Sequence, residues 1–141
     1  MTRAEELSGY IEALAYRMKV SELTNCDVVS LQEMQIISYL DAHPGAKMTR
    51  IAERMLVGLS NLTAIVDKLV KKKIVERNRS EDDRRVVLVS LTEEGKTIAK
   101  TNREQKRDLA EQMLRALDDA DQKKLIAIMR KIVGTGEVRS R

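Results

Sequence analysis

Residues 82–95 constrain the fold of this chain more than any other segment. They read Asp-Asp-Arg-Arg-Val-Val-Leu-Val-Ser-Leu-Thr-Glu-Glu-Gly, so a charged turn leads into a β-branched strand and the strand leads into a helix cap. The turn lies between two short apolar runs, Ile74–Val75 and Val86–Leu91, and this pattern predicts a β-hairpin with a charged tip. A helix-turn-helix pattern precedes the hairpin, and the combination predicts a winged helix.

Positive charge is concentrated around this hairpin. The chain of 141 residues carries a formal net charge of +4. Between Lys68 and Arg85, eight Lys or Arg residues stand against four acids, which gives 8 − 4 = +4 and leaves the remainder neutral on balance. A basic surface of this kind predicts a polyanionic partner, and no segment approaches the length needed to span a membrane. Double-stranded DNA is therefore the expected partner, and a membrane is not.

Composition narrows the class further. Hydrophobic residues make up 43% and charged residues 34%, which is typical of a soluble, folded, helix-rich protein. The absence of Phe and Trp argues against stacking on unpaired bases. A single cysteine, Cys26, excludes an intrachain disulfide framework. Residues 2–6 are charged and no apolar core follows them, so we expect no signal peptide and a cytoplasmic location.

The first half of the chain carries helical periodicity before the hairpin. One apolar stripe predicts a first helix, with Leu7, Ile11, Leu14 and Met18 along one face. Residues 21–27 lack this period and predict a loop. Ser30 and Glu33 form a capping-box pattern for a second helix that starts near residue 31 and stops at His43, just before a proline.

The helix-turn-helix itself follows. Thr49 is the predicted N-cap of a short helix that ends at Met55, and Gly58 lies in the turn where a bend or a cap is needed. A clean helical stripe then predicts a helix over residues 60–72, with Leu62, Ile65, Val66, Leu69 and Val70 on its apolar face.

Two helices are predicted after the hairpin. Thr92 caps a long fifth helix whose middle, residues 100–108, is almost wholly polar and is expected to cross solvent between two packing sites. Asp118 and Asp121 are the predicted caps of a last helix, with Leu125, Ile128, Met129 and Ile132 as its apolar stripe. Residues 134–141 are predicted to be a frayed tail.

These elements predict a mainly α fold with a small β-hairpin wing. We expect one domain, 1–141, in which a winged helix-turn-helix lobe over residues 31–92 is flanked by N- and C-terminal dimerisation helices. The end helices carry apolar faces that the lobe does not need, and a surplus apolar face usually binds a second copy of the chain. Residues 5–20 and 108–133 therefore predict a homodimer.

The polar face of the helix over residues 60–72 is the predicted reader of the major groove. Its first turns offer short hydrogen-bonding groups for base edges or phosphates, a methyl for thymine, and lysines for phosphates further along. The residues concerned are Ser60, Asn61, Thr63, Ala64, Lys68, Lys71 and Lys72. A polar face opposite an apolar stripe is more often simply solvated, but here it lies within about 26 residues of an arginine-tipped hairpin, which favours the DNA interpretation.

The hairpin tip supplies the second predicted contact. Arg84 and Arg85 suit a narrow minor groove, whose negative potential attracts guanidinium groups. Asp83 would repel DNA directly, so we interpret it as a partner that holds one of the arginines in place.

On these residues the chain resembles the MarR family of transcriptional regulators. Asp83-Arg84-Arg85, followed by Leu91-Thr92-Glu93-Glu94-Gly95, matches the wing and post-wing signature of that family, and Ile65-Val66-Asp67-Lys68-Leu69 resembles its recognition helix. The resemblance implies an obligate dimer that grips a palindromic operator, with Arg85 or Arg84 in the minor groove, and repression relieved by an effector. The chain departs from the family at Ala64, where many members have arginine. It departs again at Lys73, where a glycine is expected and a left-handed backbone would cost about 1 kcal/mol.

The resemblance also implies a crevice for a small lipophilic or phenolic ligand. Tyr10, Arg17 and Tyr39 fall at matching positions and offer polar handles for a carboxylate or phenol. Leu14, Met18 and Met34 also fall there, but we interpret them as core residues.

Other functions have weaker support in the sequence. Cys26 is a candidate redox sensor, although a lone loop cysteine is more often without a function. His43 is the only histidine and no Cys/His cluster is present, so we expect neither a metal nor another cofactor. We find no nucleophile–base pair and no phosphate-binding glycine loop, so we expect no enzyme. A winged helix used as a protein-interaction or assembly module remains an alternative.

Overall fold

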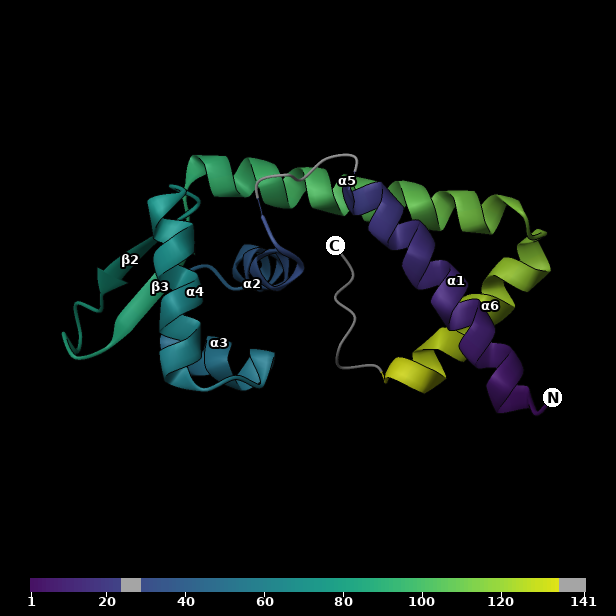
Figure 1. Ribbon diagram of the computed structural model, residues 1–141. Helices are drawn as coiled ribbons and strands as arrows, with labels where there is room; N and C mark the ends of the chain where they lie inside the picture. Colours follow the sequence, from purple (N-terminus) through teal and green to yellow (C-terminus); the bar gives the residue numbers. More distant parts are fainter. Residues whose placement is uncertain (24–28, 135–141) are drawn as a thin grey trace. The chain divides into compact units, whose positions relative to one another are not determined.

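The computed structural model describes residues 1–23 and 29–134, which divide into two units, Met1–Glu104 and Gln105–Arg141. Within these residues the fold is mainly α with one small sheet, as predicted (Figure 1). The helices are α1 (Arg3–Leu23), α2 (Leu31–Ala42), α3 (Met48–Met55), α4 (Leu59–Lys71), α5 (Glu93–Arg115) and α6 (Asp119–Val133). The strands are β1 (Ala46–Lys47), β2 (Val75–Arg79) and β3 (Val87–Leu91). The loop predicted from Ser21 starts later, since α1 continues through Leu23, and the predicted tail after Gly134 lies outside the described residues.

The predicted hairpin is present and is part of a three-stranded antiparallel sheet of order β1-β3-β2. Arg77 pairs with Val89 and Arg79 pairs with Val87 across the hairpin. The short strand β1 was not predicted, and it pairs through Lys47 with β3. Because this pairing holds Lys47 extended, α3 begins at Met48, and the N-cap is Lys47 and not Thr49 as predicted.

Three predicted helix caps are formed. The Ser30 hydroxyl accepts a hydrogen bond from the Glu33 amide at 3.1 Å, which starts α2. The Thr92 hydroxyl accepts from the Gly95 amide at 3.1 Å and donates to the Lys73 carbonyl at 2.6 Å, so this side chain both starts α5 and ties it to the end of the α4 segment. At α6 the cap is Asp118, whose carboxylate accepts from the amide of Asp121 at 2.8 Å.

Among the residues that the structure describes, two that carry side chains adopt the left-handed backbone conformation. Lys73 has φ +61°, at the position where the family pattern has a glycine, and the Ile74 amide closes the helix end by donating to the Leu69 carbonyl at 3.0 Å. Leu56 has φ +54° and forms the bend between α3 and α4. Gly58, predicted to lie where a bend or a cap is needed, is the N-cap of α4, and the bend itself is at Leu56.

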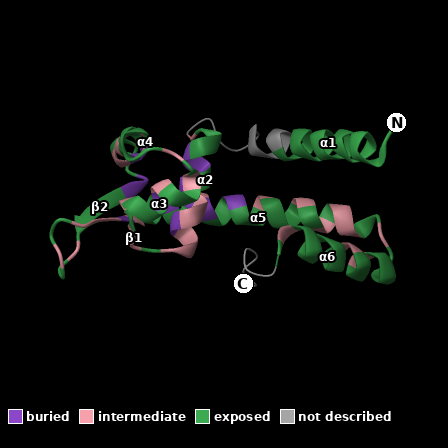
Figure 2. Cartoon of the chain, turned by 90° about the horizontal axis from the view of Figure 1, so that it is seen from below, coloured by how far each residue is buried: buried purple, intermediate pink, exposed green. Residues whose placement is uncertain are grey.

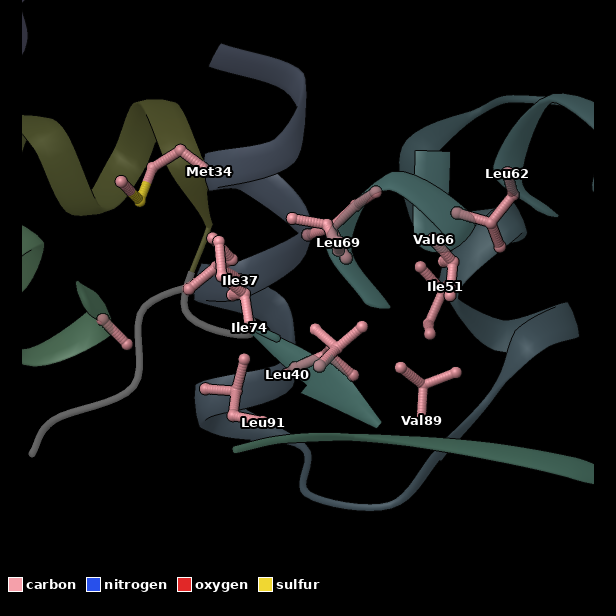
Figure 3. Packing of buried hydrophobic residues seen from close by; sticks show 13 residues of the cluster. Met34, Ile37, Leu40, Ile51, Leu62, Val66, Leu69, Ile74, Val89 and Leu91 are labelled. Atoms are coloured by element: carbon pink, nitrogen blue, oxygen red, sulfur yellow. The ribbon is translucent and has the colours of Figure 1, made fainter. Parts of the chain in front are cut away.

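The core lies where α2, α3, α4 and the sheet meet, and Figure 3 shows its side chains directed at one another. Ile37 and Leu40 of α2, Ile51 of α3 and Leu62 of α4 are almost completely inaccessible to solvent. Full burial of an aliphatic side chain stabilises a fold by about 1.5–3 kcal/mol. This packing fixes which face of α4 is turned inward, and therefore which face is left outside.

Most of residues 100–108 are exposed, in line with the solvent crossing predicted for this stretch, but one residue anchors α5 to α2. Asn102 is 4% exposed, and its amide donates to the Ser38 hydroxyl at 3.2 Å. The next residue, Arg103, forms an ion pair with Asp41. A polar residue that is buried through a paired polar group leaves no apolar signal in the sequence.

The apolar stripes of α1 and α6 are largely exposed, and Figure 2 shows both helices mostly in the colour of exposed residues. On α6, Ile128 is 48% exposed and Ile132 is 70% exposed. On α1, Leu14 and Met18 are exposed, so their interpretation as core residues was wrong, whereas the buried Met34 confirms it for that residue. The described residues thus expose apolar surface that packing within one copy of the chain does not bury.

Candidate nucleic-acid interface

The outer face of α4 displays the predicted groove-reading residues. Because Leu62, Val66 and Leu69 are turned into the core, the opposite side is left to solvent. Exposed residues there are Ser60, Asn61, Thr63, Ala64, Lys68 and Lys71. Gly58 has no side chain with which to cap α4, so the first-turn amides keep their capacity to bind an anion.

Lys72 is placed differently from the other lysines of this segment. Its ammonium group donates to both carboxylate oxygens of Glu33, at 3.1 and 2.8 Å, and the Glu33 side chain is buried at the start of α2. A buried carboxylate needs such a partner, because an unpaired buried charge costs several kcal/mol. Lys72 therefore ties the end of α4 to α2, and its role in binding phosphate stays a prediction.

At the hairpin tip, Asp83 holds Arg85. The Arg85 guanidinium donates to both carboxylate oxygens of Asp83, at 3.1 and 3.3 Å, and the Arg85 amide donates to the same group at 3.1 Å. These hydrogen bonds, with a smaller contribution from the charge of Lys47, lower the pKa of the Asp83 carboxyl below its ordinary value. The Arg85 side chain is nevertheless 91% exposed, so the carboxylate orients the guanidinium without covering it.

Arg84 is anchored through its backbone. Its carbonyl accepts a hydrogen bond at 2.8 Å from the guanidinium of Arg79 on β2, which braces the base of the tip. Of the two predicted tip arginines, Arg85 is thus the one whose side chain is positioned by a carboxylate.

A groove of about 630 Å³ lies between the front of α4 and the hairpin. Its lining is strongly basic: it includes Lys47, Arg77, Arg79 and Arg85 but no acidic residue. The complete lining is Lys47, Met48, Thr49, Leu59, Thr63, Arg77, Asn78, Arg79, Arg85, Val86 and Val87. The predicted helix residue Thr63 and the predicted tip residue Arg85 therefore meet at one surface.

Three cations of this groove were missed by the sequence prediction. Lys47 belongs to the unpredicted strand β1, whereas Arg77 and Arg79 lie on β2. Arg77 and Arg79 are two residues apart on a strand, a spacing that places side chains on one face, and this signal was available in the sequence. Arg77 also forms an ion pair of 2.5 Å with Asp67, which fastens the hairpin to α4.

The residues predicted to bind an effector do not line this groove. Tyr10 is exposed on α1 and its hydroxyl lies 3.5 Å from Glu6, and Arg17 is exposed on the same helix. Tyr39 on α2 stacks on His43, with ring centroids 4.3 Å apart. Cys26 lies outside the described residues. In the described ranges no helix is long and apolar enough to cross a membrane, and no group of three or more His, Cys, Asp or Glu is placed to hold a metal ion.

A short helix, a bend, a second helix with an exposed polar face and an antiparallel hairpin with a basic tip define the winged helix-turn-helix class. Residues 29–87 match the model of the MarR family. Two Bacillus subtilis relatives are similar to the chain. The HTH-type transcriptional regulator YfiV is 43% identical over 79 residues, 56% of this chain and 49% of YfiV, so the match spans about half the length of that relative. The regulator YpoP is 28% identical over 116 residues, 82% of each chain.

Solved structures of other proteins share the fold of this chain. Streptococcus pneumoniae FabT in complex with DNA aligns over 92% of each chain with a TM-score of 0.79 and 24% sequence identity. The matched segment, residues 29–87, is thus similar to the MarR family, and the whole chain shares the winged-helix fold of these structures.

Proposed function

We propose that this protein is a sequence-specific, double-stranded DNA-binding transcriptional regulator, acting in the cytoplasm as a dimeric repressor. The observation that carries this proposal is the acid-free groove between α4 and the hairpin, lined by four cations. A positive groove beside a helix that displays small polar residues suits the phosphate backbone and the floor of the major groove together. The names of the relatives YfiV and YpoP, and the FabT–DNA complex, support the same class.

Each group of residues is assigned to a different part of the DNA duplex. Ser60, Asn61 and Thr63 face outward at the front of α4 and would approach base edges and phosphates of the major groove, and Ala64 would approach a thymine methyl. Lys68 and Lys71 further along the same helix would neutralise phosphates. Arg85, oriented by Asp83, would enter the minor groove. A protein with these contacts binds DNA in a salt-dependent manner, because each neutralised phosphate releases counterions.

The test is a double variant at the hairpin tip, Arg84→Ala with Arg85→Ala. We expect it to lose at least about ten-fold in affinity for a specific duplex and to show a shallower dependence of log affinity on log salt, by about 0.9 per lost phosphate contact. The matched control is Lys123→Ala with Lys124→Ala, which removes the same charge from the exposed face of α6. Equal losses in both variants would reduce the effect to net charge and refute a specific role for the tip.

The dimer is the second part of the proposal. Its support is the exposed apolar surface of α1 and α6, which a single copy leaves facing water. Light scattering on the 141-residue chain should give twice the monomer mass of 16.0 kDa at micromolar concentration. A monomer at that concentration would contradict the dimer and, with it, the two-fold grip on a palindromic operator.

Relief of repression by a small lipophilic or phenolic acid is the third part. Tyr10, Arg17 and Tyr39 keep the polar handles that such a ligand needs, since the Arg17 guanidinium pairs well with a carboxylate. A hydroxybenzoic acid should release the protein from its duplex, and Arg17→Ala should weaken that release without weakening DNA binding. If no such acid changes DNA affinity, the effector part fails while the DNA-binding part stands.

The alternative function is a protein-interaction or assembly module. The turn between α3 and α4 favours it, because Leu56 in this turn is 91% exposed. The tip variant separates the two functions. An assembly module would keep its partner when Arg84 and Arg85 are removed, whereas a DNA-binding regulator would lose its duplex.

A further inference from the structure

The first turn of α4 exposes an apolar side chain in the basic groove. Leu59 is the first residue of the helix, is 51% exposed, and lines the groove beside Thr63. Thr63, one turn further, is also exposed. Core packing does not explain this leucine, because the inward face of α4 is already formed by Leu62, Val66 and Leu69. Covering this side chain with an apolar group of a ligand would add a favourable contribution to binding.

The hydrogen-bonding capacity of this face is small. The Thr63 hydroxyl donates its proton to the Leu59 carbonyl at 2.8 Å, so that proton is not offered to a ligand. Ala64 has no polar group at all. Among the side chains at the front of α4, Ser60 and Asn61 remain as donors, and neither has the reach or the charge of an arginine. Apolar contacts would therefore add to the base discrimination that Ser60 and Asn61 supply.

The cations that surround Leu59 indicate which apolar group would meet it. Lys47, Arg77, Arg79 and Arg85 line the same groove, so the occupant is a polyanion. On duplex DNA the apolar feature of the major-groove floor is the C5 methyl group of thymine, which cytosine and the purines lack. A leucine at the first turn of a helix has the length to reach that methyl.

We propose that Leu59 is a specificity-determining residue that reads a thymine C5 methyl in the major groove. This inference rests on the proposed DNA-binding function and goes one step further, because it names the base feature that is read and the side chain that reads it. Its signature is a dependence on a methyl group that takes no part in base pairing.

The experiment replaces thymine with deoxyuridine, one position at a time, in a duplex selected by the wild-type protein from random sequences. Deoxyuridine pairs like thymine but lacks the methyl. We expect affinity to fall about four-fold at one position in each half-site, which is the effect of losing one buried methyl contact, and to be unchanged elsewhere. Leu59→Ala should bind the thymine duplex more weakly and should no longer distinguish thymine from deoxyuridine at that position.

Leu31→Ala is the matched control. Leu31 is likewise the first residue of a helix and is exposed, but it is on α2 and does not line the groove. This variant should keep the four-fold discrimination. Selective wild-type binding with no deoxyuridine penalty at any position would overturn the inference while the proposed function stands, and so would a penalty that persists in Leu59→Ala. If the wild-type protein selects no sequence at all, the proposed function fails first. The deoxyuridine series on wild type needs no variant, so the test does not depend on how Leu59→Ala folds.

Discussion

Gly95 marks the closest approach between α5 and the segment that leads into β2, and replacing it with alanine is the sharpest test of the fold. A Cβ atom at this position would lie 2.2 Å from the Ile74 carbonyl oxygen, and 3.2 Å from the Leu91 Cβ. Real Cβ contacts of this kind are essentially never below 3.0 Å, so the backbone must separate by 3.0 − 2.2 = 0.8 Å or more. The obstacle is backbone, which has no side-chain rotamer with which to move aside.

The displacement has a definite energetic consequence. The Ile74 carbonyl accepts a hydrogen bond from the Thr92 amide at 3.0 Å, and a shift of 0.8 Å disrupts it. The lost hydrogen bond costs about 1 kcal/mol, and strain in the packing around Leu91 adds about 1–3 kcal/mol. The better helix propensity of alanine returns about 1 kcal/mol. Gly95→Ala should therefore lower the free energy of unfolding by about 1–3 kcal/mol.

Urea unfolding followed by circular dichroism, at one fixed protein concentration, measures this change. Gly9→Ala is the matched control, because Gly9 lies inside α1 and no atom lies within 4 Å of the place that an alanine methyl would occupy there. That control should be neutral or stabilising by up to about 1 kcal/mol. If Gly95→Ala behaves like Gly9→Ala, the close packing of α5 on Ile74 is refuted.

Three further predictions concern the interface and the dimer. In an NMR titration the pKa of the Asp83 carboxyl should lie below its ordinary value and return toward it in Arg85→Ala. Because the pKa is lowered in the folded protein, the contribution of this contact to stability is complete above the ordinary pKa and is lost as the pH falls through the folded pKa. An unchanged titration in the variant would contradict the contact. Lys72→Ala should lower the free energy of unfolding by about 1–3 kcal/mol, since it leaves the buried carboxylate of Glu33 unpaired. Lys71→Ala should leave stability unchanged and reduce the salt slope of DNA binding by about 0.9. Equal stability of the two variants would show that the buried ion pair contributes nothing. Ile128→Glu should shift the protein toward monomer in light scattering, and an unaltered mass would exclude this part of α6 from the dimer contact.

The parts of the fold that the sequence predicts well are those specified by local chemistry. The acids that follow Thr92 indicated a helix start, and the structure gives this residue the predicted cap. Lys73 lies between the end of a helix and the start of a strand, where a glycine is expected, and its φ of +61° shows why a glycine would suit the position. In both cases the neighbouring residues alone decide the conformation.

The parts that were missed depend on partners far away in the chain. The extended conformation of Lys47 is set by pairing with Leu88 of β3, distant in the sequence, and the cap predicted at Thr49 failed for that reason. Lys72 resembled its neighbour Lys71 in the sequence, and only the packing of α2 against α4 shows that one of them pairs with Glu33. Side-chain partners of this kind follow from tertiary structure and leave no local signal.

In the groove, too, the contact between sequence neighbours was predicted, whereas the residues whose placement depends on strand pairing were missed. The tip residues Asp83 and Arg85 were predicted as a pair, and their hydrogen bonds are present. Arg77 and Arg79 were counted as charge but not assigned to a site, because their direction depends on the strand register. Their spacing of two residues on one strand was the signal that could have been used.

Binding of the 141-residue chain to duplex fragments across a salt series tests the central claim most directly. The set should include the promoter next to its own gene and a scrambled duplex of the same composition. A sequence-specific regulator should bind one fragment with nanomolar affinity and the scrambled duplex at least about 10³-fold more weakly, with a log–log salt slope that corresponds to several phosphate contacts. Equal and weak affinity for every fragment would contradict a sequence-specific regulator, and would favour the assembly module in its place.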